Sequence, residues 1–350
     1  QVLKEGEVQG SDVAAHSVGV LDIKTNILAN TDALYLTAID KYGHELWRWT
    51  FPVDKLNQRT EPISLLSIRP TYTETENDLT VKANKRTFIF SKKDGQLKGV
   101  SVDNRKISFA NGPRFIGARR ADRSLDQFYN HDDEKAKEKD RTYSEFLDAA
   151  VFTKLDVKQD GGDLIVTANY KLGNLDKAQW TISPSGDLVL DYTYNFSGVV
   201  DLMGICFDYP EDQVISKRWL GAGPYRVWQN RIHGTQYDVW ENDYNDPIPG
   251  ETFTYPEFKG YFGDVSWMNI RTKEGIISLT NETPDAYVGI YQPRDGRDRL
   301  LYTLPESGIS LLNVIPPVRN KVNSTDLCGP SSQPKWVNGP QTGRIVFRFM

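Results

Sequence analysis

The sequence predicts an all-β protein built from antiparallel sandwiches, and three observations support this fold class. Of its 350 residues, 11% are aromatic, and 27 are glycine and 18 proline. Segments that alternate apolar and polar residues recur along the chain, and turn residues bound each of them. Aromatic and β-branched segments between Gly, Pro, Asn and Asp are typical of strands. The spacing of these segments does not fit an alternation of strands and helices.

Four segments alternate most regularly, namely 33–39, 87–90, 164–170 and 188–196. Turn residues bound them at 41–43, 94–95, 160–163 and 185–187. We expect each segment to form one strand of an antiparallel sheet. No internal repeat of 20–50 residues is visible.

A different pattern holds at 131–147, which is dense in charge and poor in β-formers. It indicates either a short solvated helix or a mobile loop, and in both cases a solvated surface. Residues 122–140 are expected to be the most mobile long segment, because they have little apolar surface to bury.

Prolines and weak periodicity between residues 54 and 78 indicate a domain boundary. We expect one domain at 1–67, a linker at 68–77 and a second domain at 78–350, in keeping with the length of the chain. The first domain holds only about four strand-like segments, few for a complete sandwich of the immunoglobulin type. This shortage favours a chain that begins inside a domain.

The composition excludes several classes of function. The chain carries 42 Lys and Arg against 47 Asp and Glu, a net charge of −5, so no nucleic-acid partner is expected. Its apolar runs are short, so no membrane-spanning helix is expected. The four histidines lack metal-ligand spacing and no phosphate- or dinucleotide-binding motif occurs, so neither a metal nor a cofactor is predicted. Cys206 and Cys328 are too few for a disulfide framework but allow one bridge.

Residues 237–246 interleave aromatic side chains with four carboxylic acids, Asp238, Glu241, Asp243 and Asp246. Two of these would serve a retaining glycosidase if they lay about 5–5.5 Å apart. Contact with a sugar or a partner domain is a second possibility, and a plain polar loop is the interpretation that we favour.

Trp336 ends a stretch rich in Gly, Pro and Ser that starts at Cys328. A core tryptophan usually lies in a strand with apolar neighbours, whereas one on a polar loop is more often exposed or inserted into a partner. The residues alone leave both possibilities open.

The most informative stretch is 219–231. Gly221, Gly223 and Pro224 lie there between two tryptophans and specify a sharp turn, because glycine permits unusual backbone angles and proline fixes one. The stretch resembles the W-x-G-x-G-P…(Y/W)-x-(D/N)-R signature in the C-terminal domain of family 2 glycoside hydrolases of the β-galactosidase type. Further stretches resemble the same family in the same order, at 7–53, 84–99, 111–115, 255–260 and 328–336.

This resemblance implies both a fold and a function. The fold is a partial immunoglobulin-like sandwich followed by a large antiparallel β-supersandwich. The function is to complete the substrate pocket of a retaining glycosidase and to pack against its catalytic barrel. In the family the acid and the nucleophile are glutamates of that barrel, which this chain lacks, so no catalytic residue is assigned here. A β-galactoside-like carbohydrate and the barrel are the implied partners, and a homo-oligomer is possible.

Two regions are assigned to sugar binding by the resemblance. Trp336 falls at the tryptophan that reaches into the family's active site and stacks against bound sugar. Residues 119–133 fall at a mobile loop at the mouth of that site, where Arg120, Asp122 and Asp126 are the candidate substrate contacts.

Three departures from the family leave the sugar open. The family's R-x-P-x-D-N-D run is replaced by another sequence at 119–126. Arg226 stands where the family has the glutamate of its Gly-Pro signature. The family's P-Q-E-N-G motif reads P-E-F-K-G in this sequence, at 256–260. Two functions of other classes also stay open. One is a free-standing carbohydrate-binding or interaction module, and the other is an independent hydrolase or lyase that uses carboxylates of this chain.

Overall fold

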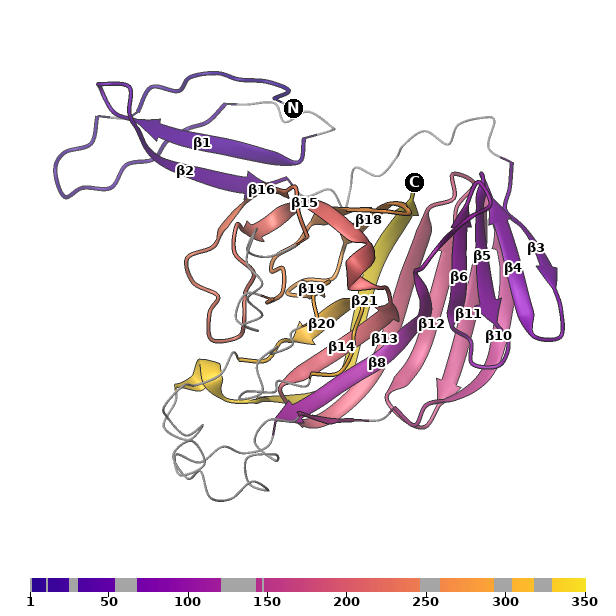
Figure 1. Cartoon of the computed structure of the whole chain (residues 1–350). Coiled ribbons are helices and arrows are strands. Elements are labelled where there is room, and N and C mark those ends of the chain that lie inside the picture. The colour runs from indigo at the N-terminus through magenta and orange to yellow at the C-terminus, as the bar shows by residue number, and fades with distance from the viewer. Residues whose placement is uncertain are drawn as a thin grey trace, which may run out of the picture. The chain divides into compact units, whose positions relative to one another are not determined.

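The computed structural model describes residues 2–10, 12–24, 31–53, 68–120, 143–146, 148–245, 259–292, 304–317 and 329–350. The chain divides into unit 1, Gln1–Ser64, and unit 2, Leu65–Met350, which are described separately (Figure 1). In these residues the regular structure is strand, apart from short 3-10 turns such as η1 (Glu211–Gln213). The predicted all-β fold class is confirmed. Within the described residues, no helix has the length and apolar character needed to span a membrane.

Unit 1 contains a hairpin of two antiparallel strands, β1 (Ala33–Ile39) and β2 (Glu45–Pro52). The carboxylate of Asp40 closes the turn, because its Oδ1 accepts the backbone N–H groups of Tyr42 at 2.8 Å and His44 at 2.9 Å. The strand and the turn expected in this part of the sequence are confirmed.

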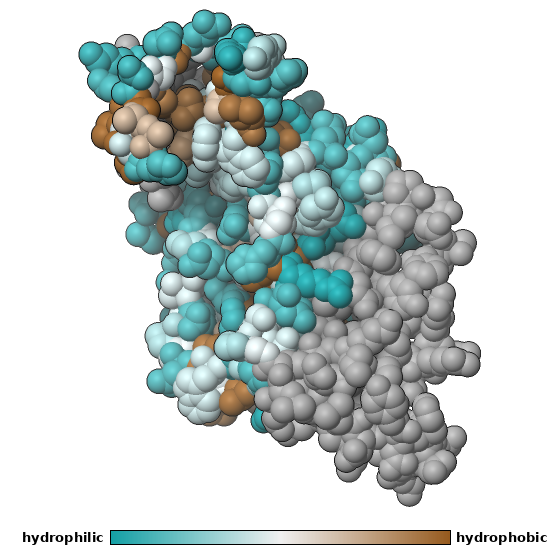
Figure 2. Space-filling model, turned by 90° about the vertical axis from the view of Figure 1, so that its left-hand side faces the viewer, coloured by the Kyte–Doolittle hydropathy of each residue, from teal (hydrophilic) through white to brown (hydrophobic). Residues whose placement is uncertain are grey.

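One face of this hairpin is apolar and exposed. Alternation places Trp47, Trp49 and Phe51 on the same side of β2, where they are 51%, 43% and 47% exposed. Leu34 and Leu36 lie on this face in β1, paired with Phe51 and Trp49. Figure 2 shows hydrophobic residues gathered over unit 1. An isolated two-stranded sheet is marginally stable in water, so a layer that covers this face would stabilise the hairpin.

Unit 2 is an antiparallel sandwich of two large sheets. The first sheet has the strand order β19-β20-β14-β8-β6-β5-β4-β3, with β7 paired to β6 and β9 to β8. Its strands are β3 (Thr71–Glu74), β4 (Asp78–Ala83), β5 (Arg86–Ser91), β6 (Leu97–Val102), β7 (Arg105–Ile107), β8 (Ala110–Arg120), β9 (Tyr143–Glu145), β14 (Leu202–Asp208), β19 (Tyr287–Gly289) and β20 (Ile309–Val314).

The second sheet has the strand order β10-β11-β12-β13-β21-β18-β17-β15-β16. Its strands are β10 (Val151–Asp160), β11 (Asp163–Lys171), β12 (Leu175–Ile182), β13 (Leu188–Val200), β15 (Val214–Gly223), β16 (Gln236–Asn242), β17 (Trp267–Thr272), β18 (Gly275–Asn281) and β21 (Lys335–Phe349). The strands expected at 87–90, 164–170 and 188–196 are confirmed as β5, β11 and β13.

The main core lies between the two sheets and is rich in aromatic rings. Phe90 in β5 contacts Trp180 in β12 with 6.0 Å between ring centroids. Phe115 in β8 contacts Tyr194 in β13 at 5.4 Å. Alternation causes these contacts, because it points every second side chain of each strand toward the opposite sheet.

A second hydrophobic cluster covers the other face of the first sheet. β14 is buried on both faces, since Met203 and Ile205 belong to the main core and Leu202 and Cys206 to this cluster. The whole cluster consists of Ile116, Ala118, Leu202, Cys206, Val227, Trp228, Tyr261, Leu304, Leu312 and Ile315. Residues outside the named strands, Trp228 among them, therefore form a third layer over the middle of this sheet.

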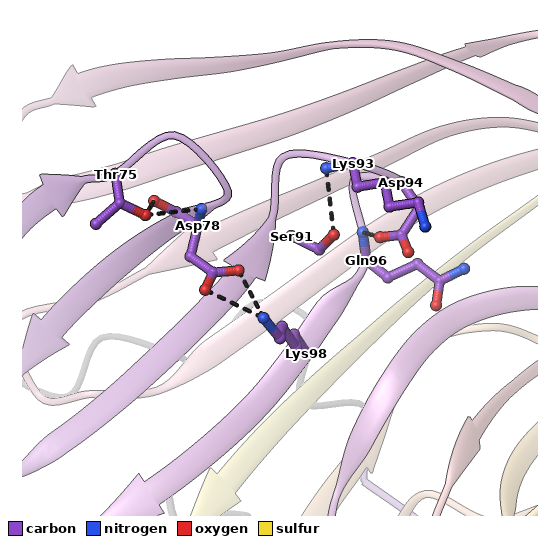
Figure 3. A network of polar contacts seen from close by, with 7 residues as sticks. All are labelled: Thr75, Asp78, Ser91, Lys93, Asp94, Gln96 and Lys98. Carbon is purple, nitrogen blue, oxygen red and sulfur yellow. Dashed lines mark hydrogen bonds and ion pairs between the residues drawn. The ribbon is translucent and has the colours of Figure 1, made fainter.

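The tight turns of the first sheet are closed by polar side chains (Figure 3). Between β3 and β4, Thr75 Oγ1 accepts the N–H group of Asp78 at 3.0 Å, and the Asp78 carboxylate pairs with Lys98 at 2.9 Å. Between β5 and β6, Asp94 Oδ1 accepts the N–H group of Gln96 at 3.1 Å. Polar residues at these positions replace the backbone partners that the strands lose where they reverse.

Two segments are strands where a loop was expected. Residues 237–242 are not a polar loop but belong to edge strand β16, because Tyr237, Val239 and Trp240 are strong β-formers. Trp336 does not end a loop but is the second residue of β21, which pairs with β13 from Lys335 to Phe347.

Two other segments bear on expectations about boundaries and mobility. β3 begins at Thr71, inside the stretch 68–77 expected as a linker, and pairs with β4. In 131–147 the structure describes 143–146, and β9 lies there. The segment 122–140 lies outside the described residues.

Candidate functional site

The signature turn at the end of β15 requires small residues because the chain runs against other atoms there. A side chain at Gly223 would overlap the Trp240 ring, and a Cβ at Gly221 would lie 3.0 Å from the Gly263 carbonyl oxygen. Trp219 is 1% exposed, and its Nε1 donates to the carbonyl oxygen of Ala222 at 3.1 Å. The glycines of the signature therefore serve close packing of the backbone.

The next part of the signature is a turn anchored by Trp228. This side chain is 1% exposed and meets Tyr261 edge to face, with 5.5 Å between ring centroids. The N–H group of Arg231 donates to the Trp228 carbonyl oxygen at 2.8 Å, which closes the turn. Val227 exchanges backbone hydrogen bonds with Tyr261 at 2.7 and 2.9 Å. The segment 227–231 is thus fixed to the second hydrophobic cluster.

The strand ends that carry Arg120 and Trp336 lie at one end of unit 2. β8 ends at Arg120, and the N–H group of Asp201 donates to the carbonyl oxygen of Ala118 in the same strand at 2.9 Å. Val200, next to Asp201, pairs with Lys335 at the start of β21. In Figure 1 the end of β8 and the yellow turn η4 (Pro330–Ser332), which precedes β21, lie at the same lower end.

The structure therefore brings the backbone of Arg120 and that of Trp336 to the same end of the sandwich. Asp122 and Asp126 lie outside the described residues, as do residues 121–133 of the expected loop. Their contribution to a site stays a prediction.

Trp336 is 71% exposed, opposite Val199 of β13. Of the tryptophans that the structure describes in unit 2, it alone is exposed; Trp180, Trp219 and Trp228 are 0%, 1% and 1% exposed. A large aromatic face presented to solvent on a paired strand is suited to stacking on the apolar face of a sugar.

The carboxylates of β16 do not form a matched pair. Asp238 and Glu241 lie on opposite faces of the strand, because side chains alternate. Glu241 lies 3.7 Å from Arg218, and Asp243 is an exposed residue just after the strand. Asp246 lies outside the described residues. Asp238 and Glu241 cannot act together on one glycosidic bond in this arrangement.

A polar cluster that sequence reasoning missed surrounds Tyr291. Lys217 is 1% exposed, and its Nζ donates to the carbonyl oxygen of Tyr244 at 3.0 Å and lies 4.7 Å from the centre of the Tyr291 ring. The guanidinium carbon of Arg226, the residue that replaces the family's glutamate, lies 5.7 Å from the same ring centre. The alternation of β15 predicts a strand but gives no sign of a buried lysine.

A neighbouring ion pair involves another departure from the family. Lys259 Nζ lies 2.7 Å from Glu211 Oε1, and Glu211 Oε2 accepts the N–H group of Gln292 at 2.8 Å. Glu211 and Lys259 are both mostly buried, so this pair ties η1 to two other segments of unit 2.

The Cys206 thiol is buried and free. Burial raises its pKa to about 11, although the nearby Arg114 guanidinium acts in the opposite direction. Such a thiol is a poor nucleophile at neutral pH. Cys328, its possible partner, lies outside the described residues. In the described ranges no three or more His, Cys, Asp or Glu side chains form a group that would hold a metal ion.

A family model described as "Beta galactosidase small chain" matches residues 82–313, which include the signature turn and both large sheets in part. The chain belongs to the β-galactosidase small-chain family. The relation to β-galactosidases expected from residues 219–231 is confirmed at this level. Comparison with curated protein sequences finds no match.

Among solved structures, this small-chain family member is similar to a galactose 1-epimerase from Lactobacillus acidophilus, with 10% identity and a TM-score of 0.45 over 81% of this chain and 99% of that one. It is also similar to a GalM/aldose epimerase homologue from C. elegans, with 10% identity and a TM-score of 0.39 over 80% of this chain and 99% of that one. Both TM-scores are too low to support an argument about function.

Proposed function

We propose that this chain is the non-catalytic C-terminal portion of a β-galactosidase-like retaining glycosidase. It completes the substrate pocket and packs against the catalytic barrel, which another part of the enzyme supplies. In this proposal unit 1 is the later part of an immunoglobulin-like domain and unit 2 is the supersandwich domain, with the boundary near residues 68–77. The family match to β-galactosidase small chains supports the assignment to this type of enzyme.

The observation that carries the proposal is the exposure of Trp336. Its side chain is 71% exposed although its backbone is paired with Val199 in a continuous sheet. An exposed tryptophan face on a paired strand is suited to stacking on a ligand. We assign it the stacking contact with the sugar, and we keep Arg120, Asp122 and Asp126 as further candidate polar contacts.

The exposed face of the unit 1 hairpin supports packing on another part of the enzyme. Trp47, Trp49 and Phe51 present a contiguous aromatic surface, and a two-stranded sheet becomes stable when such a face is covered.

The proposal is tested by complementation. The purified chain is mixed with a β-galactosidase catalytic polypeptide that lacks the corresponding C-terminal region, and turnover of nitrophenyl β-galactoside is followed. We expect turnover from the mixture and none from either component alone. Turnover by this chain alone would contradict the proposal and favour an independent hydrolase.

The alternative is a free-standing carbohydrate-binding module, which the same exposed tryptophan favours. It predicts saturable binding of galactosides by the chain alone, and titration calorimetry of the isolated chain measures this directly. Binding at micromolar affinity without any catalytic polypeptide would replace our proposal with this alternative.

A further inference from the structure

The signature turn is hydrogen-bonded to the segment that leads into Trp336. Gln229 Nε2 donates to the carbonyl oxygen of Gln333 at 2.6 Å. Next to it, Asn230 Nδ2 lies 3.5 Å from Ser332 Oγ. The N–H group of Gln229 also donates to the carbonyl oxygen of Pro316 at 3.1 Å. One turn therefore contacts two segments that are distant in the sequence.

The turn is a firm anchor for this contact. Trp228, the residue before Gln229, is 1% exposed in the second hydrophobic cluster. Gln229 itself is 6% exposed, so its amide cannot turn away into solvent. The position of its Nε2 is thus set by the packing beneath it.

The segment that Gln229 contacts is a short turn directly before β21. Ser332 and Gln333 belong to a single 3-10 turn, closed by hydrogen bonds of 2.9 Å to Gly329 and 3.2 Å to Pro330. β21 begins directly afterwards, and Lys335 and Trp336 form its first pairs with β13. The first residues of a strand fray unless the preceding segment is fixed.

Stability alone does not account for a glutamine here. Gln229 Oε1 is buried and has no hydrogen-bond partner among the described residues, and an unmet buried acceptor opposes folding. The hydrogen bond that its side chain does make is the one to Gln333.

We infer that Gln229 is a positioning residue for Trp336. By fixing Gln333 it prevents the start of β21 from fraying, and so holds the Trp336 ring in one place for stacking on the sugar. The sugar-binding part of this inference rests on the proposed function, whereas the mechanical link from Gln229 to Trp336 does not.

The mechanical link is tested on the whole chain labelled with 5-fluorotryptophan. Fluorine NMR reports each tryptophan, and the Trp336→Phe variant identifies the Trp336 signal. Gln229→Met keeps the length of the side chain but removes the donor. We expect it to shift or broaden the Trp336 signal. A Trp336 signal that stays unchanged while that of the adjacent Trp228 moves would overturn the inference.

The control is Gln159→Met, at an exposed position. Gln159 Nε2 also donates to a carbonyl oxygen, that of Asp163 at 2.9 Å, but in the β10–β11 hairpin. This variant loses the same kind of hydrogen bond and is expected to leave the Trp336 signal in place. An equal change of that signal in the control would show a general effect of losing such a bond and would overturn the inference.

The functional link is tested in the complemented enzyme. Gln229→Met is expected to raise KM about threefold with little change in kcat, and to add nothing once Trp336 is alanine, because both act through the same contact. If the effects of the two substitutions on KM are additive, Gln229 does not act through Trp336, and the inference is overturned. If Trp336→Ala leaves KM unchanged, the proposed function fails, and the NMR result still decides whether Gln229 positions the ring.

Discussion

Replacing Trp336 by alanine separates a functional tryptophan from a structural one. Trp228 is the matched comparison, because it is the same residue type in the same unit but is 1% exposed where Trp336 is 71% exposed. We expect Trp336→Ala to weaken sugar binding and to affect folding little. Trp228→Ala is expected to do the reverse, in that it destabilises the whole unit.

The magnitudes follow from burial. Only about three tenths of the Trp336 side chain is covered, which at about 25 cal/mol per Å² over about 250 Å² gives at most about 2 kcal/mol of stability. Truncating a fully buried tryptophan costs about 3–5 kcal/mol. At about 2 °C per kcal/mol for a unit of this size, the melting temperature should fall by at most about 4 °C for Trp336→Ala and by about 6–10 °C for Trp228→Ala.

The assay combines thermal melts of the isolated chain with KM for a galactoside in the complemented enzyme. Loss of a stacked aromatic contact corresponds to about 1–2 kcal/mol, or about a tenfold rise in KM. A melting shift for Trp336→Ala as large as that for Trp228→Ala, with KM unaltered, would refute the reasoning and make Trp336 a structural residue.

Two further predictions concern the sandwich itself. A methyl group at Gly204 would overlap the Leu311 carbonyl oxygen, whereas Gly99 has nothing within 4 Å of an added Cβ. Gly204→Ala should therefore lower the free energy of unfolding by about 1–3 kcal/mol, and Gly99→Ala should not. Equal denaturant midpoints for the two variants would contradict the packing of β14 against β20. Burial raises the pKa of Tyr192 to about 12, so its contribution to stability is complete below the unfolded value of about 10 and is lost as pH rises from there through 12. Denaturant midpoints measured from pH 9 to 12 should fall in this window, and less so for Tyr192→Phe; an identical fall in both proteins would exclude this tyrosine as a cause.

Much of the fold was predictable because most strands have one buried face. The segments 87–90, 164–170 and 188–196 lie in β5, β11 and β13, and burial alternates along β11 and the first half of β13. Alternation fails as a signal where both faces are buried, as in β14, whose outer face is covered by the second hydrophobic cluster. At β16 the acidic residues between aromatic ones favoured a loop over a strand. An edge strand tolerates such charged residues, so the alternation there was the better signal.

The site was predictable only in part, because residues that contact one another in it lie far apart in the sequence. The exposure of Trp336 could be suspected from its polar neighbours, but the bond from Gln229 to Gln333 joins residues 104 positions apart, and no local pattern encodes such a pair. The same holds for Lys217, whose partners Tyr244 and Tyr291 lie in the segments that follow β16 and β19. Local propensity determines elements, whereas the partners of a polar side chain are determined by tertiary packing.

Tryptophans between the two sheets of unit 2 are buried, whereas those of the unit 1 hairpin are exposed, and this difference bears on the two candidate functions. In unit 2 Trp180 and Trp219 are at most 1% exposed, whereas Trp47 and Trp49 of unit 1 are 51% and 43% exposed on a strand with the same alternation. Trp180 and Trp219 belong to the core between the two sheets of unit 2, where the opposite sheet covers them. A free-standing module would keep the hairpin face in water, whereas a portion of a larger enzyme would bury it against another chain segment. Binding of a hydrophobic dye by the isolated chain, lost on complementation, is therefore expected; a chain that binds no dye and remains monomeric at high concentration would favour the module.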